Sequence, residues 1–529
     1  MTSTPIHIET PLERTAGIDV TRLVPWVVGA VVLAVGMMLI DTLPVGVIHD
    51  DGMYIILAKS LATGQGFRWL NVPGAPRATH FPPGYPAVLA LLWWIVPTFP
   101  KNVLLFKTAN ALFTGIAAAA TARYVQRRFA MSPSAAAAFA LVALLGIPTL
   151  ALSVMVMSEP LFLALLMPAL VLAERVADHE ETNRRDVIVL GLLCGAATLV
   201  RTHGMALVLA APIVLATRRR YADAALCAAI AIAVVLPWQL WVSLNAGIFP
   251  EPMRGNYESY GAWLIAGVRV EGIGLLARTA QRTSTELAAM FATLIAPAMP
   301  GAIRITLLLA LGGLAVAGAR LYWRRAPVSL LFFGFYTTIV VLWPFTPARF
   351  AWGIWPLVLL LPVLGGWELA TWRPATRAVR SIRAFGLTAA TCVALGYATY
   401  TLRGYRGQWW ESIPRKNAAI LRPVVLWAAR ETAPGDLIAA EGESAVYLYA
   451  NRMAVPVQTF TVQEYFRPRT PAENAAAIRA ILARYPARVV AVSSPRMWEA
   501  ARELATEHPP LLVLRDTFPG GIALTPVPR

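Results

Sequence analysis

Long apolar runs are the feature that most constrains how this chain can fold. A stretch of about 20 apolar residues is long enough to cross the hydrocarbon core of a bilayer as a helix. The runs lie at residues 25–43, 102–122, 134–151, 158–175, 187–201, 203–217, 222–242, 301–320, 328–345, 350–371 and 384–402. The sequence therefore predicts an all-α polytopic membrane protein with about 11 transmembrane helices.

Composition supports the membrane class and excludes two others. The chain has 529 residues, of which 57% are apolar and only 14% are charged. A soluble protein averages roughly 25% charged residues, and a disordered chain is poor in large apolar residues. The three cysteines, Cys194, Cys227 and Cys392, lie inside apolar runs, so neither a disulfide framework nor a cysteine metal site is expected.

Arginines in the loops predict the orientation of the chain. With a cytoplasmic N-terminus every cytoplasmic turn is basic, whereas the short outer turns carry few or no Lys or Arg. The cytoplasmic arginines are then Arg14, Arg22, Arg123, Arg127, Arg128, Arg175, Arg184, Arg185, Arg218, Arg219, Arg220, Arg320, Arg324, Arg325, Arg373, Arg377, Arg380 and Arg383. The stretch 84–97 is too short for a span, and counting it as one would invert every later segment. We interpret it as an interfacial or re-entrant helix.

This orientation divides the chain into three parts. Residues 1–24 form a cytoplasmic N-terminus, 25–402 a transmembrane domain, and 403–529 a domain outside the cytoplasm. Two large loops, 44–101 and 243–300, also lie outside. The cytoplasmic segments hold the largest share of the formal net charge of +17, so the charge is mainly an orientation signal and does not indicate a nucleic-acid partner. We expect a multi-pass protein of a bacterial plasma membrane.

The tail differs from the rest of the chain, because its apolar runs are short. Runs at 436–441, 445–449, 488–493 and 511–514 are typical of strands. The segments 473–485 and 495–507 have the pattern of helices. The tail is therefore predicted to be a small α/β domain.

The first outer loop contains adjacent carboxylates, Asp50 and Asp51, directly after the first span. The apolar spacing that follows, beginning at Tyr54, predicts a short amphipathic helix on the membrane surface. Neighbouring like charges resist joint ionisation, so one carboxylate could act as a base or bind a metal. Alternatively, Asp50 caps the helix and Asp51 interacts with its positive end. The two interpretations are compatible.

Further ionisable residues fall at the outer ends of spans. Glu159 begins one span, Arg201 and His203 lie in a tight outer turn, and Arg349 precedes another span. Ionisable groups at membrane depth are costly and tend to be functional, and arginines suit a phosphate. Alternatively, the arginines extend to lipid headgroups. His80 lies in the loop before paired prolines, and a solvated loop histidine is its plainer interpretation.

Several motifs together resemble one family. The motifs are Asp50-Asp51, the helix ending at Ser60–Gly64, Pro82–Pro86, Met157–Phe162, Gly191–Gly204 and Ala348–Phe350. They resemble GT-C fold glycosyltransferases, in the branch of the protein O-mannosyltransferases and the lipid A aminoarabinose transferase. The resemblance covers residues 25–402, and the tail is similar to the extracytoplasmic domain of many bacterial members.

The resemblance implies an enzyme that moves a sugar from a polyprenyl-phosphate carrier to a glycan, lipid or protein acceptor on the extracytoplasmic face, with inversion. It implies that Asp50 is the base, that Asp51 is its acidic partner, and that Glu159 helps to order the acceptor or a metal. Where the aminoarabinose branch has a phosphate-binding lysine this chain has Phe81, so other side chains must supply the charge. We assign substrate binding to Tyr54, Lys59, His80, Tyr85, Glu159, Arg201, His203 and Arg349.

Some alternatives remain open at the level of sequence. No cofactor is required, although a divalent metal on Asp50, Asp51 and Glu159 is compatible with the residues. A transporter or flippase for a lipid-linked saccharide or anion is the second function. Transporters place ionisable residues near the midplane and carry internal repeats, and neither pattern is evident here. A binding or assembly protein that works through the tail is the third.

Overall fold

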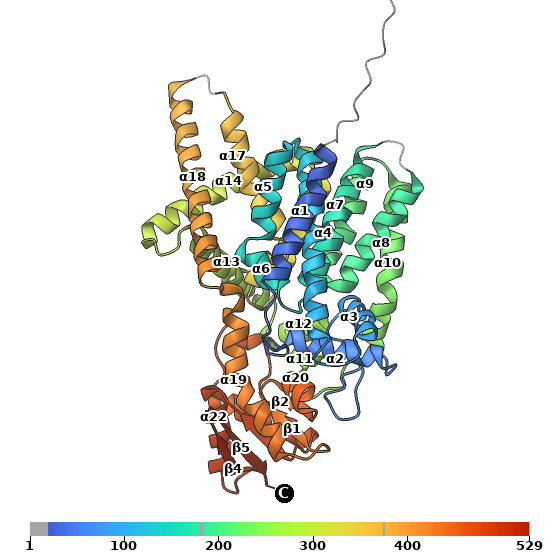
Figure 1. Ribbon diagram of the computed structural model, residues 1–529, viewed down its shortest axis with the longest axis vertical. Helices are drawn as coiled ribbons and strands as arrows, with labels where there is room; N and C mark the ends of the chain where they lie inside the picture. Colours follow the sequence, from blue (N-terminus) through green and yellow to red (C-terminus); the bar gives the residue numbers. More distant parts are fainter. Residues whose placement is uncertain (1–19, 180–182, 374–375, 528–529) are drawn as a thin grey trace, which may run out of the picture.

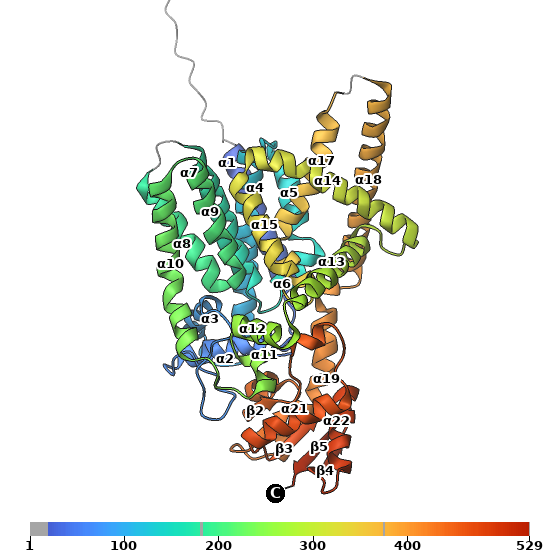
Figure 2. The same ribbon diagram turned by 180° about the vertical axis from the view of Figure 1, so that it is seen from behind.

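The structure is a computed structural model, and it describes residues 20–179, 183–373 and 376–527. The predicted cytoplasmic segment 1–24 therefore lies mostly outside the described residues, and so does Arg14. A bundle of helices forms the larger part, and a small α/β domain lies at one end of it (Figure 1). Figure 2 shows the same bundle from behind, with α7 to α10 on one side and α13, α14, α17 and α18 on the other.

The bundle contains helices long enough to cross a membrane. Six helices of the described residues are long and apolar enough, or up to eight if each of two bent pairs is one span. The six are α1 (Val20–Met38), α4 (Val103–Phe129), α7 (Glu159–Asp178), α10 (Tyr221–Leu244), α14 (Gly301–Arg325) and α18 (Arg377–Arg406). The chain is therefore a polytopic membrane protein, and the number of about 11 spans stays a prediction.

The other predicted spans are shorter or bent. The pair α5 (Pro133–Leu144) and α6 (Ile147–Ser153) bends by 61°. Shorter apolar helices are α9 (Met205–Thr217), α15 (Pro327–Val341), α17 (Trp355–Thr371) and α3 (Gly84–Ile95), the last of which was not predicted as a span. Helix α8 (Arg184–Val200) covers another predicted span and has 17 residues. The outer loop 243–300 holds α11 (Arg254–Tyr257) and a second bent pair, α12 (Tyr260–Glu271) and α13 (Gly274–Ile295), which meet at 112°.

Glycines allow the helices of the bundle to approach closely. A Cβ atom on Gly29 of α1 would lie 2.8 Å from the carbonyl oxygen of Gly115 in α4, and the converse distance is also 2.8 Å. A Cβ atom on Gly318 of α14 would overlap the backbone of Leu361 in α17. Close backbone approach through small residues is a common means of packing membrane helices, because lipid provides no hydrophobic drive between them.

The basic turns gather at the end of the bundle away from the α/β domain. Arg128 at the end of α4 forms an ion pair with Asp178 and donates to the carbonyl oxygen of Arg325. Arg218 lies 3.3 Å from the same carboxylate. Turns distant in the sequence therefore form one basic end, the pattern that the orientation rule uses.

Helix α2 (Asp50–Ala62) lies between the bundle and the α/β domain (Figure 1). The prediction of an amphipathic surface helix is wrong here, because residues 51–58 are all buried. The reason is that the α/β domain packs against α2: a Cβ atom on Gly52 would lie 2.6 Å from the Ser444 hydroxyl of that domain. Local spacing cannot report such a contact.

The α/β domain is joined to α18 by α19 (Trp409–Glu431) and contains one five-stranded sheet in the order β2-β1-β3-β5-β4. The strands are β1 (Leu437–Ala440), β2 (Met453–Pro456), β3 (Val489–Val492), β4 (Leu512–Phe518) and β5 (Gly521–Pro526). Strand β1 runs parallel to β2 and β3, whereas β5 pairs antiparallel with β3 and β4. Helices α21 (Pro471–Arg484) and α22 (Pro495–Thr506) connect strands. The small α/β domain is confirmed.

One strand of the prediction is wrong. Residues 445–449 belong to a helical turn, α20 (Glu443–Ala445) followed by a π-helical turn at Val446–Ala450. The strand β2 begins after it, and β5 was not predicted. A short apolar run fits a buried helical turn as well as a strand, so periodicity alone does not separate the two.

Candidate active site

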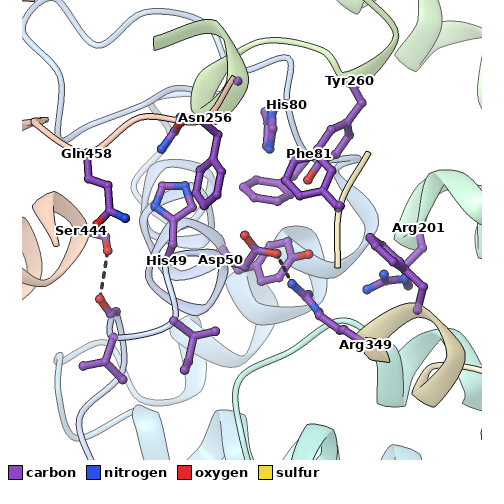
Figure 3. A pocket seen from close by; sticks show the side chains of 18 of the residues that line it. His49, Asp50, His80, Phe81, Arg201, Asn256, Tyr260, Arg349, Ser444 and Gln458 are labelled. Atoms are coloured by element: carbon purple, nitrogen blue, oxygen red, sulfur yellow. Dashed lines mark hydrogen bonds and ion pairs between the residues drawn. The ribbon is translucent and has the colours of Figure 1, made fainter. Parts of the chain in front are cut away.

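A cavity of about 560 Å³ lies where the bundle, the first outer loop and the α/β domain meet (Figure 3). It collects residues from distant segments of the chain. The polar and ionisable residues that line it are His49, Asp50, Tyr54, His80, Arg201, Thr202, His203, Asn256, Tyr260, Arg349, Asn417, Glu441, Glu443, Ser444, Gln458 and Ser494. Aromatic side chains, including Phe81, Trp343 and Phe345, form much of the remaining wall.

Arg349 joins two carboxylates at this cavity. Its Nη1 atom donates to Asp50 Oδ2 at 2.5 Å, and its Nε atom donates to Glu159 Oε1 at 2.5 Å. Arg201 Nη1 lies 2.7 Å from the same Glu159 oxygen and donates to the Ser158 hydroxyl at 3.0 Å. Two arginines and two carboxylates thus balance one another, as buried charges must.

Burial separates the members of this network. Only 1% of the Glu159 side chain is exposed, compared with 19% for Asp50 and 28% for Arg349. Burial is the largest single effect and would raise the pKa of Asp50, but the charge and hydrogen bond of Arg349, together with the nearby histidines, outweigh it, so the pKa lies below its ordinary value. Asp50 is therefore ionised at neutral pH and faces the cavity, with Glu159 behind Arg349.

Asp51 requires a correction. Its carboxylate accepts hydrogen bonds from the backbone amides of Gly46, Ile48 and Gly52, at 2.8, 3.0 and 2.9 Å. It is buried, and it is not among the residues that line the cavity. Burial raises its pKa, against the effect of these amides. This placement makes Asp51 a residue that holds the loop before α2, and it does not support a share in the chemistry.

The two histidines predicted from the sequence, His80 and His203, both line the cavity but have different surroundings. His80 Nδ1 donates to the carbonyl oxygen of Glu258 at 2.6 Å. Burial lowers the pKa of His80 to about 4, so the ring is uncharged at neutral pH. The expectation that His80 could supply positive charge is therefore not supported. The His203 ring stacks on Phe350 with 4.9 Å between centroids.

Lys59 and Tyr85 are not brought to the cavity. The ammonium of Lys59 lies over the ring of Tyr447, 4.7 Å from its centroid. The Tyr85 hydroxyl donates to Asn110 Oδ1 at 3.1 Å. Tyr54, which does line the cavity, packs edge-on against Tyr85 at 5.0 Å. Tyr85 therefore packs behind Tyr54 in the wall of the cavity. Because Lys59 lies elsewhere, it does not add its charge to those of Arg201 and Arg349 at the cavity.

The metal site considered from the sequence does not form. Asp50 and Glu159 are both engaged by Arg349, and the Asp51 carboxylate is taken up by backbone amides. Within residues 20–179, 183–373 and 376–527, no three His, Cys, Asp or Glu side chains gather as a metal site would need. These three carboxylates therefore do not fit a shared ion.

Sequence reasoning missed the residues that the α/β domain contributes. Glu443, Ser444 and Gln458 line the cavity, as does His49, which precedes Asp50. His49 was visible as the neighbour of Asp50. The three tail residues carried no signal, because the tail was interpreted as a domain separate from the transmembrane part.

The fold of this chain is similar to that of known proteins, although its sequence is not. No protein-family model matches the sequence, and no curated protein matches it. Solved structures that match in fold include two of ArnT from Cupriavidus metallidurans. The structure bound to undecaprenyl phosphate gives a TM-score of 0.51 at 13% identity, over 96% of this chain and 98% of that one. The apo structure gives 0.51 at 12% identity, over 95% and 97%. The predicted fold is confirmed along nearly the whole chain: it is the GT-C fold of ArnT.

Proposed function

We propose that this chain is a membrane glycosyltransferase that takes its sugar from a polyprenyl-phosphate carrier. The observation that carries the proposal is the Asp50–Arg349–Glu159–Arg201 network at a cavity that adjoins an apolar bundle. The GT-C fold shared with ArnT, which has been solved bound to undecaprenyl phosphate, supports the same donor class.

The arginines suit the donor phosphate. Among the cavity-lining residues that the structure describes, Arg201 and Arg349 are the only Lys or Arg side chains. Guanidinium groups bind phosphate oxygens through paired, charge-assisted hydrogen bonds. They replace the phosphate-binding lysine that the aminoarabinose branch would place at the position of Phe81. The lipid tail of the donor would extend along the apolar helices.

The transfer step follows from these positions. The acceptor hydroxyl oxygen attacks the anomeric carbon of the donor, and its proton passes to the Asp50 carboxylate. The bond between the anomeric carbon and the phosphate oxygen breaks, and its electron pair remains on the phosphate. Arg201 and Arg349 stabilise the charge that develops there. Attack from the face opposite the phosphate inverts the anomeric centre.

Arg349 has a second part in this step. In the structure it is paired with Asp50 at 2.5 Å, which makes the carboxylate a weak base. An incoming phosphate competes for the same guanidinium. Binding of the donor therefore releases Asp50 from its partner and raises its basicity when a substrate is present. Glu159 keeps Arg349 in place through the other side of the guanidinium.

The side of the membrane forms part of the proposal. The α/β domain lines part of the cavity, and this domain lies at the end of the bundle opposite the basic turns (Figure 1). By the positive-inside rule this end faces away from the cytoplasm of a bacterial plasma membrane. The acceptor would be a cell-envelope glycan, lipid or protein.

The test separates donor binding from chemistry. Purified protein is assayed for undecaprenyl-phosphate binding and for transfer from a polyprenyl-phosphate sugar. We expect Asp50→Asn to bind the carrier but to lose about 10²–10⁴-fold in transfer, the usual contribution of a general base. Near-normal transfer by a folded Asp50→Asn protein would remove the proposed base. A wild-type protein that moves the lipid between leaflets without transfer would favour the flippase.

A further inference from the structure

The cavity has two chemically different ends, with Asp50 between them (Figure 3). Arg201 and Arg349 form one end. The other end carries His49, Ser444 and Gln458. On the α/β-domain side the cavity is also lined by Glu443, whose carboxylate lies 3.6 Å from His49, and by Glu441 in the same segment. Since the arginines are the only Lys or Arg among the described lining residues, this second end has acidic and uncharged groups but no permanent cation.

The two glutamates at the second end are fixed. Glu443 accepts from the Tyr257 hydroxyl at 3.1 Å, and Tyr257 in turn accepts from the Asn71 amide at 2.8 Å. Glu441 accepts from the backbone amides of Ser493 and Ser494 at 2.5 and 2.7 Å. Both glutamates are buried. Among the residues that the structure describes, neither glutamate has an arginine or lysine ion-pair partner, so both carboxylates are held at the wall by hydrogen bonds.

His49 is held at this wall in a strained conformation. Its backbone has φ 74° and ψ −69°, a region that residues other than glycine rarely occupy. Such strain persists where the surrounding structure enforces it, often at functional sites. Nδ1 lies 3.6 Å from Glu443 Oε1, and Nε2 is buried without a hydrogen-bond partner in the described structure. A neutral imidazole that carries its proton on the nitrogen facing the carboxylate offers its other nitrogen, Nε2, as an acceptor.

The remaining surface suits a carbohydrate. The Gln458 amide is exposed and makes no hydrogen bond to the described residues. Phe345, Phe460 and Trp343 provide flat apolar surface at the same cavity. A sugar ring has hydroxyl groups that can hydrogen-bond to the Gln458 amide and C–H faces that can pack on the aromatic side chains. An anionic group would meet Glu441 and Glu443 at short range, where like charges repel strongly.

We propose that this second end, built by His49 and the α/β domain, is the acceptor subsite, and that it takes an uncharged, hydroxyl-rich glycan. The acceptor hydroxyl donates to His49 Nε2 or to Asp50, and the wall glutamates exclude acceptors with an anionic group beside the reacting hydroxyl. The assignment of this end as an acceptor subsite rests on the proposed transferase function. The preference of the wall for uncharged or cationic groups does not depend on that function.

The first test measures the charge of the wall without any transfer. Gln458→Cys is introduced into the full chain together with Cys392→Ser, because Cys392 is exposed whereas Cys194 and Cys227 are buried. Reaction rates with cationic and anionic methanethiosulfonates are compared with those of a free thiol. We expect about a tenfold preference for the cation, reduced by Glu443→Gln. No preference, or one indifferent to Glu443→Gln, would overturn the proposal.

The second test measures acceptor choice. Transfer is assayed with a panel of neutral disaccharides, each matched by its uronic-acid counterpart. We expect the neutral acceptors to be used about tenfold better, and Glu443→Gln to narrow this difference. His49→Gly, which tolerates the positive φ, should lower acceptor kcat/KM while undecaprenyl-phosphate binding is kept. Glu499→Gln, on an exposed position of α22, is the matched control.

The outcomes distinguish the two proposals. Equal use of uronic acids by the wild-type protein would overturn the acceptor subsite and leave the transferase intact. Absence of carrier binding and of all transfer, together with a cation preference at residue 458, would overturn the transferase and leave a charge-selective wall.

Discussion

At the scale of single residues, the two adjacent aspartates have different environments. The Asp50 carboxylate faces a cavity and an arginine, whereas the Asp51 carboxylate faces three backbone amides. The sequence marked both positions as one acidic pair. The sequence could not distinguish their roles, because the roles depend on the direction in which each side chain points from the start of α2.

Asp51→Ala tests the structural role of Asp51. The change leaves the amides of Gly46, Ile48 and Gly52 without their acceptor, so we expect a loss of about 1–3 kcal/mol or more in the free energy of unfolding. Thermal unfolding of the detergent-solubilised protein measures it. Asp51→Asn keeps one acceptor oxygen and should lose less. An Asp51→Ala protein of normal stability but without transfer would instead support direct participation.

Arg349→Gln tests the electrostatic control of Asp50. Burial raises the pKa of Asp50, and Arg349 is the main group that lowers it, through its charge and its hydrogen bond, so the pKa should rise when Arg349 is removed. Transfer requires ionised Asp50 and is lost as the pH falls through its pKa. The acidic limb of the pH profile of kcat/KM, which reports the free enzyme, should therefore move to higher pH in Arg349→Gln, measured on the residual activity. An unmoved limb would show that another group acts as the base.

At the scale of elements, the sequence predicted those whose pattern is local. The long apolar helices, the helices at 471–484 and 495–506, and the strands β1, β3 and β4 lie where their residues indicate. Helix α2 and residues 445–449 were assigned wrongly. Each of these segments contacts parts of the chain that are distant in sequence. Its buried residues therefore do not follow a periodic apolar pattern that the local sequence could reveal.

Gly115→Ala tests the close contact of α1 and α4. The new Cβ atom would lie 2.8 Å from the Gly29 carbonyl oxygen, and both atoms belong to helix backbones that cannot shift separately. We expect a loss of about 1–3 kcal/mol in stability, the usual cost of overpacking. Gly313→Ala, where no atom lies within 4 Å, is the matched control. It should be neutral or stabilising, and equal effects at both positions would contradict the packing argument.

At the scale of the whole molecule, the site depends on contacts between distant segments. Arg349 and Asp50 are 299 positions apart in the chain, yet they share a hydrogen bond. His49 and Glu443 come from the transmembrane part and the tail. Motif order predicted that Asp50, Glu159, Arg201 and Arg349 belong to one site. It could not predict that the tail closes the cavity, since the interpretation of the tail treated it as a separate unit.

The orientation of the whole molecule is the last prediction. If the basic turns are cytoplasmic, the α/β domain and the cavity face outward, which is the side on which the proposed lipid-linked donor would be used. Single cysteines at Glu499, on the α/β domain, and at Arg324, in the basic end, report the two sides in a Cys392→Ser background. In intact cells a membrane-impermeant maleimide should label Glu499→Cys, and it should label Arg324→Cys only after the membrane is opened. The reverse result would place the cavity in the cytoplasm, and the arginines of the basic turns would then need another explanation than topology.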